Sequence, residues 1–363
     1  MNRIAIIIPY FGKLPNWMDI FLMSAANNRK IDFLIFTDDA SIHSLTYASA
    51  KNIIIQNWNF EQIQNLVKEK LQGVLPRAYK LCDYRPCYGY LFSDFLHGYD
   101  YWGHCDVDTV LGDIMSFLKS VNYQKYERLF LHGHFILYKN SDSMNKLFME
   151  PVPKELPPTM KFNFVRKTCY ACHYDEVGIN LLCSFYEKKF CKTEISYDVS
   201  YYYESFRLSK HKPNIAPLVT YEDGHIYGYE LDTMTEEIYR KEYGYVHFMR
   251  RRFASQQCIP NKRLAITHKG FIHLEKNEEI TPEYILSYSG EKPPTREPYL
   301  LQIQRSTLRK LYDLFILDFK VRGLLALNTI VAVYQGIAFI KRNGNDNIYD
   351  SPWFNGTINY KTH

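Results

Sequence analysis

Two aspartates separated by one residue, Asp106 and Asp108, have the types and spacing that best suit chemistry in this chain. They follow the segment 99–105, which has the pattern of a strand running into a turn. Carboxylates at positions i and i+2 of an irregular turn can converge on one hard divalent cation, Mn²⁺ or Mg²⁺. Such a cation neutralises the charge that develops on a departing diphosphate. Aspartates near turns also cap backbone N–H groups, so the spacing by itself leaves both roles open.

Basic residues lie in the segment just before this turn. Arg77, Lys80 and Arg85 could contact phosphates or ligand hydroxyls, and arginine suits this role because its guanidinium can donate two parallel hydrogen bonds. Lys80 and Asp83 are three residues apart, a spacing that equally suits a structural ion pair. The pattern leaves both roles of Lys80 open.

A second acidic pair, Asp175 and Glu176, opens a predicted helix over 175–188. Negative charge at a helix N-terminus is favoured by the helix dipole, so capping is a sufficient structural role for the pair. A carboxylate in a crevice could instead activate or orient a reacting hydroxyl as a general base. We favour this catalytic role for one of the two residues.

Alternating apolar and amphipathic segments indicate the elements that must position these residues. Segments 4–8, 32–37 and 52–55 are short, apolar and rich in β-branched residues, as expected of strands buried on both faces. Segments with helical spacing follow at 17–28 and 60–71. This alternation predicts an α/β fold with a Rossmann-type, mostly parallel sheet flanked by helices.

The acidic residues are predicted to meet at one edge of this sheet. Sheets of this kind bind ligands outside the carboxyl ends of their strands, and both Asp38-Asp39 and Asp106-Asp108 follow predicted strands. The two clusters are therefore expected to share one crevice. The chain contains neither a G-x-G-x-x-G nor a G-x-x-x-x-G-K-[ST] motif, so that crevice is expected to be neither a dinucleotide-binding fingerprint nor a P-loop.

The composition is that of an ordinary globular protein, with 46% hydrophobic and 23% charged residues in a chain of 363. The net charge of +5 is modest and no basic stripe precedes residue 300, so nucleic acid is not an expected partner. Aromatic residues reach 16%. Aromatic surfaces suit carbohydrate, because ring faces stack on sugar C–H groups, but an aromatic core would account for the number equally well.

The eight cysteines are scattered along the chain, which fits reduced thiols better than a disulfide framework. The close pair Cys169 and Cys172 is a weak zinc signal without a second pair, and packing cysteines are the favoured interpretation. The N-terminal apolar run is stopped by Pro9 before it reaches the length of a signal-peptide core. These features predict a cytoplasmic protein.

A proline cluster at 293–298 marks a predicted boundary between a domain over residues 1–295 and a helical tail over 296–363. Within the tail, residues 323–340 carry no charge, but the stretch is barely long enough to span a bilayer and contains polar residues. Flanking lysines and arginines fit an amphipathic helix lying peripherally on the inner face of the membrane. A helical pair packed on the domain is an equally good interpretation.

Seven sequence segments together indicate a family. Each is a weak signal alone, but their occurrence in one order along the chain is specific. They are IIIPYFG (6–12), FLIFTDD (33–39), RAYKLCDYRP (77–86), YWGHCDVD (101–108), GHFILY (133–138), DEVGIN (175–180) and VHF (246–248). Together they resemble a bacterial family of nucleotide-sugar glycosyltransferases of GT-A type, found among enzymes that build capsular and other surface polysaccharides. The resemblance covers roughly residues 3–255 and implies a GT-A-like fold.

This resemblance implies a nucleotide pocket at the end of the first strand. Pro9, Tyr10 and Asp38 would line the pocket, with Asp38 or Asp39 near the base or ribose. The donor would be a nucleotide sugar, with a UDP-sugar favoured. Arg77, Lys80 and Arg85 would face its phosphates or hydroxyls, whereas the run of three arginines over 250–252 departs from the expected pattern.

The resemblance also completes the metal site. Asp106 and Asp108 would bind Mn²⁺ or Mg²⁺ together with the diphosphate, and His247 would be the third protein ligand, a role for which neutral imidazole is suited. A buried, hydrogen-bonded core histidine is the alternative for His247. His132 and His134 could contact an acceptor sugar, although lone histidines more often serve packing.

The expected activity is transfer of a hexose-type sugar from a nucleoside diphosphate sugar to a glycan or lipid-linked acceptor in surface polysaccharide synthesis. A sugar-nucleotide nucleotidyltransferase is the alternative enzyme, but the chain lacks the glycine-rich phosphate loop expected near its first strand. A non-catalytic carbohydrate-binding or scaffold protein with a transferase fold is the third hypothesis. The retention of Asp106, Asp108 and His247 argues against it.

Overall fold

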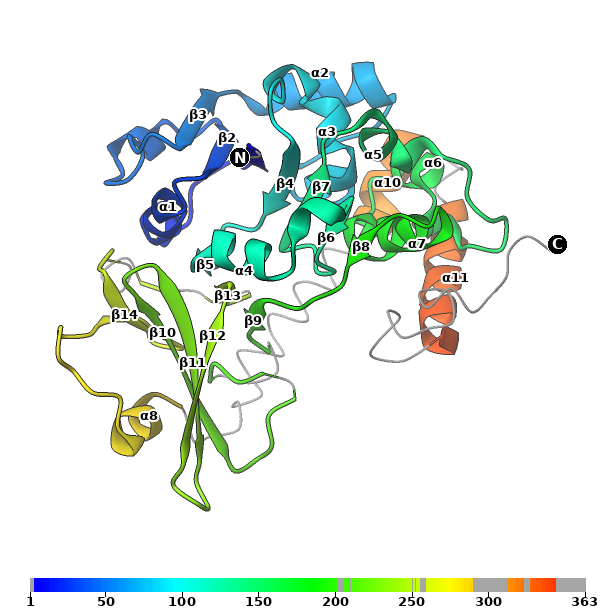
Figure 1. Cartoon of the computed structure of the whole chain (residues 1–363). Coiled ribbons are helices and arrows are strands. Elements are labelled where there is room, and N and C mark those ends of the chain that lie inside the picture. Colours follow the sequence, from blue (N-terminus) through cyan, green and yellow to red (C-terminus); the bar gives the residue numbers. More distant parts are fainter. Residues whose placement is uncertain are drawn as a thin grey trace.

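The structure is a computed structural model that describes residues 3–200, 205–208, 210–249, 251, 253–254, 259–289, 312–322 and 327–343. A seven-stranded sheet forms its centre, with helices on both faces, and a five-stranded sheet lies beside it (Figure 1). The predicted mixed α/β class is confirmed.

The central sheet has the strand order β3-β2-β1-β4-β7-β6-β8. Its strands are β1 (Ile4–Pro9), β2 (Ile31–Thr37), β3 (Ile53–Asn57), β4 (Tyr101–Cys105), β6 (Arg128–Leu129), β7 (Phe135–Lys139) and β8 (Phe190–Cys191). Paired strands are parallel except at β7, which runs antiparallel to β4 and β6. The mostly parallel sheet is therefore confirmed, and the carboxyl ends of β1 to β4 lie at one edge.

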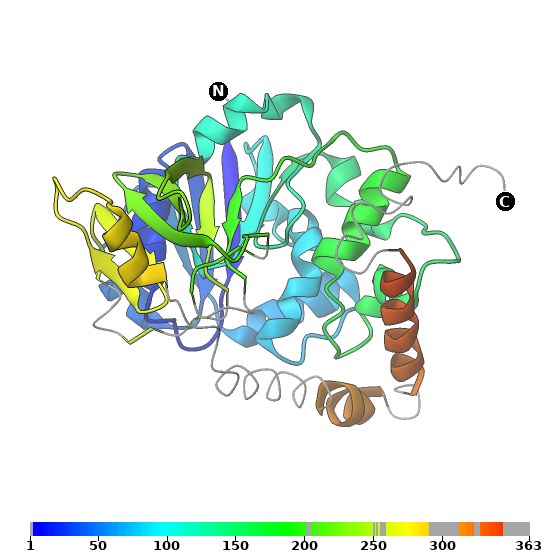
Figure 2. The same cartoon turned by 90° about the horizontal axis from the view of Figure 1, so that it is seen from below.

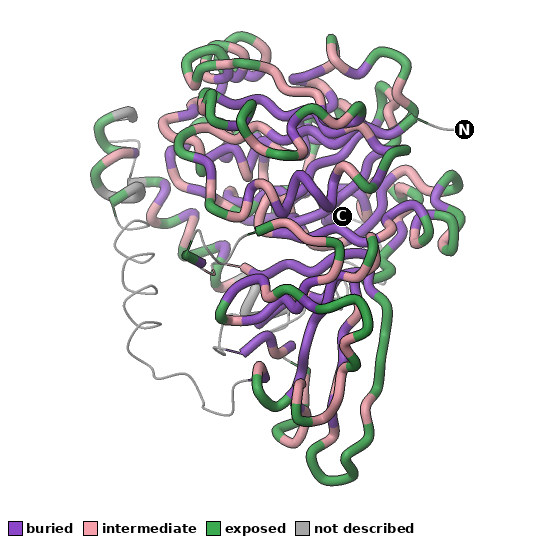
Figure 3. The backbone as a smooth tube through the Cα atoms, turned by 90° about the vertical axis from the view of Figure 1, so that its left-hand side faces the viewer, coloured by how far each residue is buried: buried purple, intermediate pink, exposed green. Residues whose placement is uncertain are grey.

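Strand β1 shows why the continuous apolar runs form buried strands. Ile4, Ile6 and Ile8 pack into one hydrophobic cluster, while Ala5 and Ile7 pack into a second cluster on the opposite face. A strand that is covered on both faces needs an apolar residue at every position. Figure 3 shows that buried segments, drawn in purple, run through the middle of the molecule.

Helices on the two faces complete these clusters. Helix α1 (Met18–Asn27) belongs to the first cluster and helix α2 (Phe60–Leu71) to the second. The N-terminus of α2 is a capping box, in which Asn59 Oδ1 accepts from Gln62 N at 2.9 Å and Gln62 Oε1 accepts from Asn59 N at 2.8 Å. Shorter helices are α3 (Tyr88–Leu91), α4 (Ile114–Ser120), α5 (Asp142–Asn145), α6 (Phe162–Val165) and α7 (Ile179–Phe185).

Residues Asp106, Val107 and Asp108 form a turn after β4, which we call the DVD turn. The segment before this turn is more helical than its sequence pattern predicts. The pattern favours a helix over 90–96, but a 3₁₀ helix already begins at Ala78 and runs to Cys87, directly before α3. Pro86 lies inside this helix and has no backbone N–H to donate, so a regular α-helical ladder cannot continue through it. This irregular segment carries Lys80 and Arg85.

The sequence over 195–300 mixes strand-like and turn-like segments, and its described residues form an antiparallel sheet of order β12-β11-β10-β14-β15. Its strands are β10 (Ile215–Glu222), β11 (His225–Asp232), β12 (Ile238–Tyr243), β14 (Arg263–Thr267) and β15 (Gly270–His273). Helix α8 (Pro282–Ser289) packs on it through Ile285. A smaller sheet of β5 (Thr109–Leu111), β13 (Tyr245–His247) and β9 (Ser196–Asp198) links the DVD turn to this region.

The described part of the tail packs on the domain, as one of the two interpretations expected. It contains helices α10 (Asp318–Arg322) and α11 (Leu327–Asn343), which lie beside the region around α6 and α7 (Figure 2). The boundary prolines and the basic residues at 305, 309 and 310 lie outside the described residues. No helix among the described residues has the length and hydropathy needed to cross a bilayer.

A buried carboxylate holds the tail to the domain. Asp318 Oδ1 accepts from Thr168 Oγ1 at 3.1 Å and from Cys169 N at 2.9 Å, and Asp318 Oδ2 accepts from Thr329 Oγ1 at 2.5 Å. Asp318 is fully buried. One side chain therefore joins α10, α11 and the segment that leads towards Asp175.

Replacing Asp318 by alanine is expected to lower the free energy of unfolding by about 1–3 kcal/mol, because buried donors lose their acceptor. Urea unfolding of the full chain measures this loss. Asp94→Ala is a matched control, because the Asp94 side chain is 81% exposed and its ion pair with Lys70 spans 3.8 Å. Equal stability of the two variants would contradict the role assigned to Asp318.

Candidate functional site

The DVD turn is held by contacts from three different elements. Asp106 N donates to His134 O at 3.0 Å, and Thr109 Oγ1 donates to Asp106 O at 2.7 Å. Trp17 Nε1, at the start of α1, donates to Val107 O at 3.0 Å. The turn follows β4 at the carboxyl edge of the central sheet, so its carboxylates have a fixed backbone beneath them.

Strand pairing brings His247 to this turn. Strand β13 runs antiparallel to β5, and His247 lies opposite Thr109. His247 Nε2 is 3.5 Å from Asp108 Oδ1 and 4.0 Å from Asp106 Oδ2. Ligand atoms about 2.1 Å from one octahedral ion lie about 3 Å apart when adjacent and about 4 Å apart when opposite. The three side chains therefore fit a Mg²⁺ or Mn²⁺ ion, and they form one of the two candidate cation groups among the described residues.

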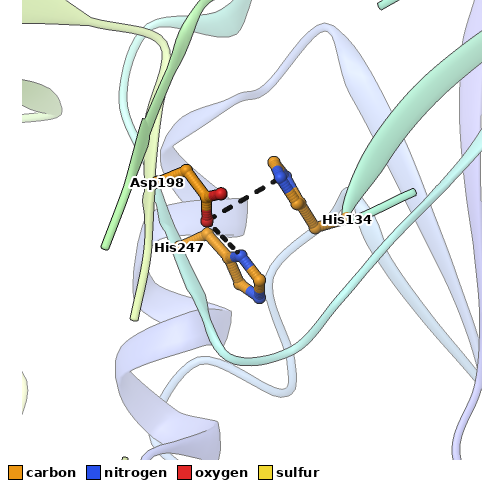
Figure 4. Close-up of side chains that lie close together, drawn as sticks. All are labelled: His134, Asp198 and His247. Atoms are coloured by element: carbon orange, nitrogen blue, oxygen red, sulfur yellow. Dashed lines mark hydrogen bonds and ion pairs between the residues drawn. The ribbon is translucent and has the colours of Figure 1, made fainter. Parts of the chain in front are cut away.

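The second candidate group shares His247 and adds His134 and Asp198 (Figure 4). His247 Nδ1 is 2.8 Å from Asp198 Oδ1, and the His134 ring stacks on the His247 ring with centroids 4.3 Å apart. Burial disfavours the charged form of His247, but Asp108 and Asp198 outweigh burial and raise its pKa well above the usual value. Sequence reasoning did not find Asp198, because only the β9–β13 pairing places it opposite His247.

Arg85 lies between two of the predicted acidic residues. Its guanidinium donates to Asp106 Oδ1, to Asp175 Oδ2 at 2.9 Å and to the carbonyl oxygen of Gly133 at 3.0 Å. Burial raises the pKa of Asp106, and Arg85 opposes that shift. The contacts of this arginine therefore fix carboxylates within the site. The contact with phosphates or ligand hydroxyls that the sequence suggested stays a prediction.

Asp175 and Glu176 lie on a single π-helical turn, Tyr174–Gly178, before α7. Glu176 Oε1 accepts from Gly133 N at 2.9 Å, and a Cβ added to Gly133 would lie 2.8 Å from Asp175 Oδ2. A larger residue at position 133 would therefore require the Asp175 carboxylate to shift. Burial raises the pKa of Asp175 to about 8, with Arg85 acting in the opposite direction. The structure thus brings the second acidic pair next to Asp106.

Tyr10 directly follows β1 and lies near the DVD turn. Loss of surrounding water, together with the charges of Asp108 and Asp39, raises the pKa of the Tyr10 phenol, so this ring lies near both acidic clusters. Asp38 Oδ1 accepts from Gly12 N at 2.7 Å, and Asp39 Oδ2 accepts from Leu14 N at 2.9 Å. Both carboxylates thus shape the loop after Pro9, the last residue of β1.

Lys80 forms the structural ion pair that the sequence left open. Lys80 and Asp83 are completely buried, and Lys80 Nζ is 2.6 Å from Asp83 Oδ2 and 2.6 Å from Tyr170 O. Asp83 also accepts from the backbone N–H groups of Cys172 and Tyr174. The guanidinium of Arg77 lies over the Tyr79 ring, 5.4 Å from its centroid.

The cysteine pair forms no disulfide. Seven cysteines are described and all are free thiols; Cys258 lies outside the described residues. Burial raises the pKa of the Cys172 thiol. Cys169 is fully buried, and both residues of the pair fit the packing role expected for them.

The fold and the site define an α/β protein with a carboxylate–histidine group at the carboxyl edge of a mostly parallel sheet. Residues 6–275 match the family of unknown function DUF6625, and the chain belongs to this family. No curated protein matches the chain.

Among solved structures, the chain is similar to the glycosyltransferase GlyE of Streptococcus pneumoniae TIGR4, with 11% identity and a TM-score of 0.28 over 53% of this chain and 46% of GlyE. It is also similar to the galactosyltransferase LgtC, which was solved in complex with donor and acceptor sugar analogues. That match has 10% identity and a TM-score of 0.33 over 55% of this chain and 77% of LgtC. The chain thus matches about half the length of GlyE.

Proposed function

We propose that this protein is a metal-dependent glycosyltransferase that moves a hexose-type sugar from a nucleoside diphosphate sugar to a glycan or lipid-linked acceptor. The observation that carries the proposal is the convergence of Asp106, Asp108 and His247, with ligand atoms within 4.8 Å of one another, beside the loop that follows β1. Oxygen-rich groups of this kind suit Mg²⁺ or Mn²⁺. A ligand at the carboxyl edge of the sheet would contact both this group of three side chains and the loop that follows β1.

In this proposal Asp106, Asp108 and His247 hold the cation, which when bound would neutralise charge on the departing nucleoside diphosphate. Arg85 keeps Asp106 in place from the protein side through their ion pair. Tyr10, Asp38 and the end of β1 at Pro9 would contact the nucleotide, with Asp39 shaping the loop. A UDP-sugar remains the favoured donor.

The acceptor would lie on the side of Asp175 and Glu176. One of these two carboxylates would orient the acceptor hydroxyl or accept its proton as a general base. Glu176 is half-buried and Asp175 is almost completely buried, so Glu176 is the more accessible of the two to a sugar. The proposed setting is surface polysaccharide synthesis at the inner face of the membrane.

Thermal unfolding with a panel of nucleoside diphosphates and nucleotide sugars, each with and without Mn²⁺, tests the proposal. One nucleoside diphosphate is expected to stabilise the chain in the presence of Mn²⁺, by about 2.7 kcal/mol at a hundredfold excess over its Kd. The corresponding nucleotide sugar should then release that diphosphate in the presence of an acceptor.

Two results would contradict this proposal. Release of pyrophosphate from a nucleoside triphosphate and a sugar phosphate would instead identify a nucleotidyltransferase. Glycan binding in calorimetry without affinity for nucleotide or Mn²⁺ would identify a binding protein. Asp94→Asn should respond to every ligand like the unaltered chain, because Asp94 is exposed.

A further inference from the structure

The β9–β13 pairing places a carboxylate behind the candidate metal-ligating histidine. The two strands run parallel, and Asp198 lies opposite His247 in their register. His247 is almost completely buried, so its two ring nitrogens have few possible partners other than protein groups. One nitrogen, Nδ1, lies 2.8 Å from Asp198 Oδ1, while Nε2 faces the DVD turn.

This arrangement selects one tautomer of neutral His247. An ionised carboxylate can accept a hydrogen bond but cannot donate one, so Nδ1 must carry the proton that joins His247 to Asp198. The lone pair of the neutral ring is then on Nε2, the nitrogen that lies 3.5 Å from Asp108 Oδ1. Carboxylates that accept from the second nitrogen of a ligating histidine fix its orientation and raise its basicity.

His134 restrains the plane of the same ring. Its ring is stacked on that of His247 at an interplanar angle of 27°, and the Tyr245 hydroxyl lies 2.7 Å from His134 Nδ1. Asp198 therefore sets which edge of His247 faces the turn, and His134 limits its tilt. In Figure 4 dashed lines join Asp198 to both histidines, because Asp198 Oδ1 also lies 3.9 Å from His134 Nε2.

We propose that Asp198 is a positioning residue of the metal site, which holds His247 in the tautomer and orientation that present Nε2 to a cation bound by Asp106 and Asp108. The inference rests on the proposed metal site and extends it to a residue on β9. Asp198 itself would not touch the cation or the substrate.

A cation held by His134, Asp198 and His247 is the competing arrangement. It would have to take the place of the Nδ1 proton of His247. The same imidazole could ligate a second ion through Nε2 only if both of its nitrogens had lost their protons, which neutral imidazole does not permit. The two groups are therefore alternatives, and the bond between Nδ1 and Asp198 favours an ion at the DVD turn.

Mn²⁺ binding to the full-length chain tests the inference without any assay of activity. Calorimetry gives the affinity, and pulsed EPR detects coupling of bound Mn²⁺ to a coordinated imidazole nitrogen. Asp198→Ala is expected to weaken Mn²⁺ binding by about 10–100-fold and to reduce the nitrogen coupling. Asp94→Ala, the exposed control, should change neither quantity.

A double-mutant cycle separates positioning from a general structural effect. If Asp198 acts through His247, then Asp198→Ala should not weaken Mn²⁺ binding further in a His247→Ala background. Circular dichroism and thermal unfolding establish that each variant is folded. Unchanged affinity and nitrogen coupling in Asp198→Ala, or fully additive losses in the double variant, would overturn the role of Asp198 while leaving the metal site itself intact.

The variant Asp108→Asn distinguishes failure of the inference from failure of the proposed function. It should lose Mn²⁺ affinity whether or not Asp198 positions His247. If Asp108→Asn binds Mn²⁺ normally while His134→Phe does not, the ion lies between His134, Asp198 and His247. That result would refute both the proposed catalytic site and the positioning role.

Discussion

Replacing Asp108 by asparagine should reduce turnover by about a thousandfold at an Mn²⁺ concentration that saturates the unaltered protein. The change keeps the size of the side chain and removes its charge, so the cation loses an anionic ligand next to Asp106. A metal ion that stabilises charge on a leaving group contributes several kcal/mol to catalysis, and about 1.4 kcal/mol corresponds to a factor of ten in rate. Initial rates of nucleoside diphosphate release measure the effect.

Asp94→Asn makes the same chemical change at an exposed position and should leave turnover unaltered. His247→Ala should have a smaller effect than Asp108→Asn, because it removes a neutral ligand and leaves both carboxylates in place. If Asp108→Asn kept full turnover and full Mn²⁺ affinity, the Asp108 carboxylate would not be a metal ligand. Asp108 would then contribute only through its backbone contacts. The hydrogen bond that Phe248 N donates to Asp108 O, at 3.1 Å, joins two main-chain atoms, so it remains in Asp108→Asn.

The parallel part of the central sheet could be predicted because its strands are buried on both faces. Continuous apolar runs such as 4–8 and 32–37 are typical of such strands when they alternate with amphipathic helices along the chain. The direction of β7 could not be predicted in this way. A short apolar segment has the same composition whether its neighbour is parallel or antiparallel, so the reversal at β7 depends on the path of the chain through β5, α4 and β6.

The place of the candidate site in the fold was predictable to the extent that its residues follow strands. Asp106 and Asp108 lie in a recognisable turn, and the resemblance carried His247 to the same place. Arg85 was identified as a site residue, but its bridging of Asp106 and Asp175 requires a contact across 90 positions of the chain to Asp175. No spacing rule encodes such a contact.

Asp198 carried no signal in the sequence, for a related reason. Its proposed role comes from lying opposite His247 on a neighbouring strand, 49 positions away in the chain. Strands β9 and β13 are each three residues long, which is too short for alternation to define a face. A residue that would position a metal-ligating side chain is therefore harder to find from the sequence than the metal-ligating residue itself.

Replacing Lys80 by methionine should lower the free energy of unfolding by about 3–5 kcal/mol, because the substitution leaves Asp83 buried without its counter-charge. Burial lowers the pKa of Lys80, but Asp83 more than reverses this effect and raises it, so Lys80 is charged in the folded protein. Asp83 cannot move to solvent easily, since it also accepts from Cys172 N at 2.8 Å and Tyr174 N at 3.0 Å. Urea unfolding of the full chain measures the loss.

Lys146→Met is the matched control. Lys146 and Asp142 form an ion pair with the same 2.6 Å separation, but their side chains are 47% and 80% exposed. Removing an exposed pair of this kind costs about 0–1 kcal/mol, so the difference between the two lysine variants isolates the effect of burial.

The same pair of variants decides between the two roles that the sequence left open for Lys80. A Lys80→Met protein of unaltered stability that no longer binds nucleotide would restore Lys80 to the donor site. Loss of stability with nucleotide affinity retained in the folded fraction would leave it as the support of the segment that carries Asp175.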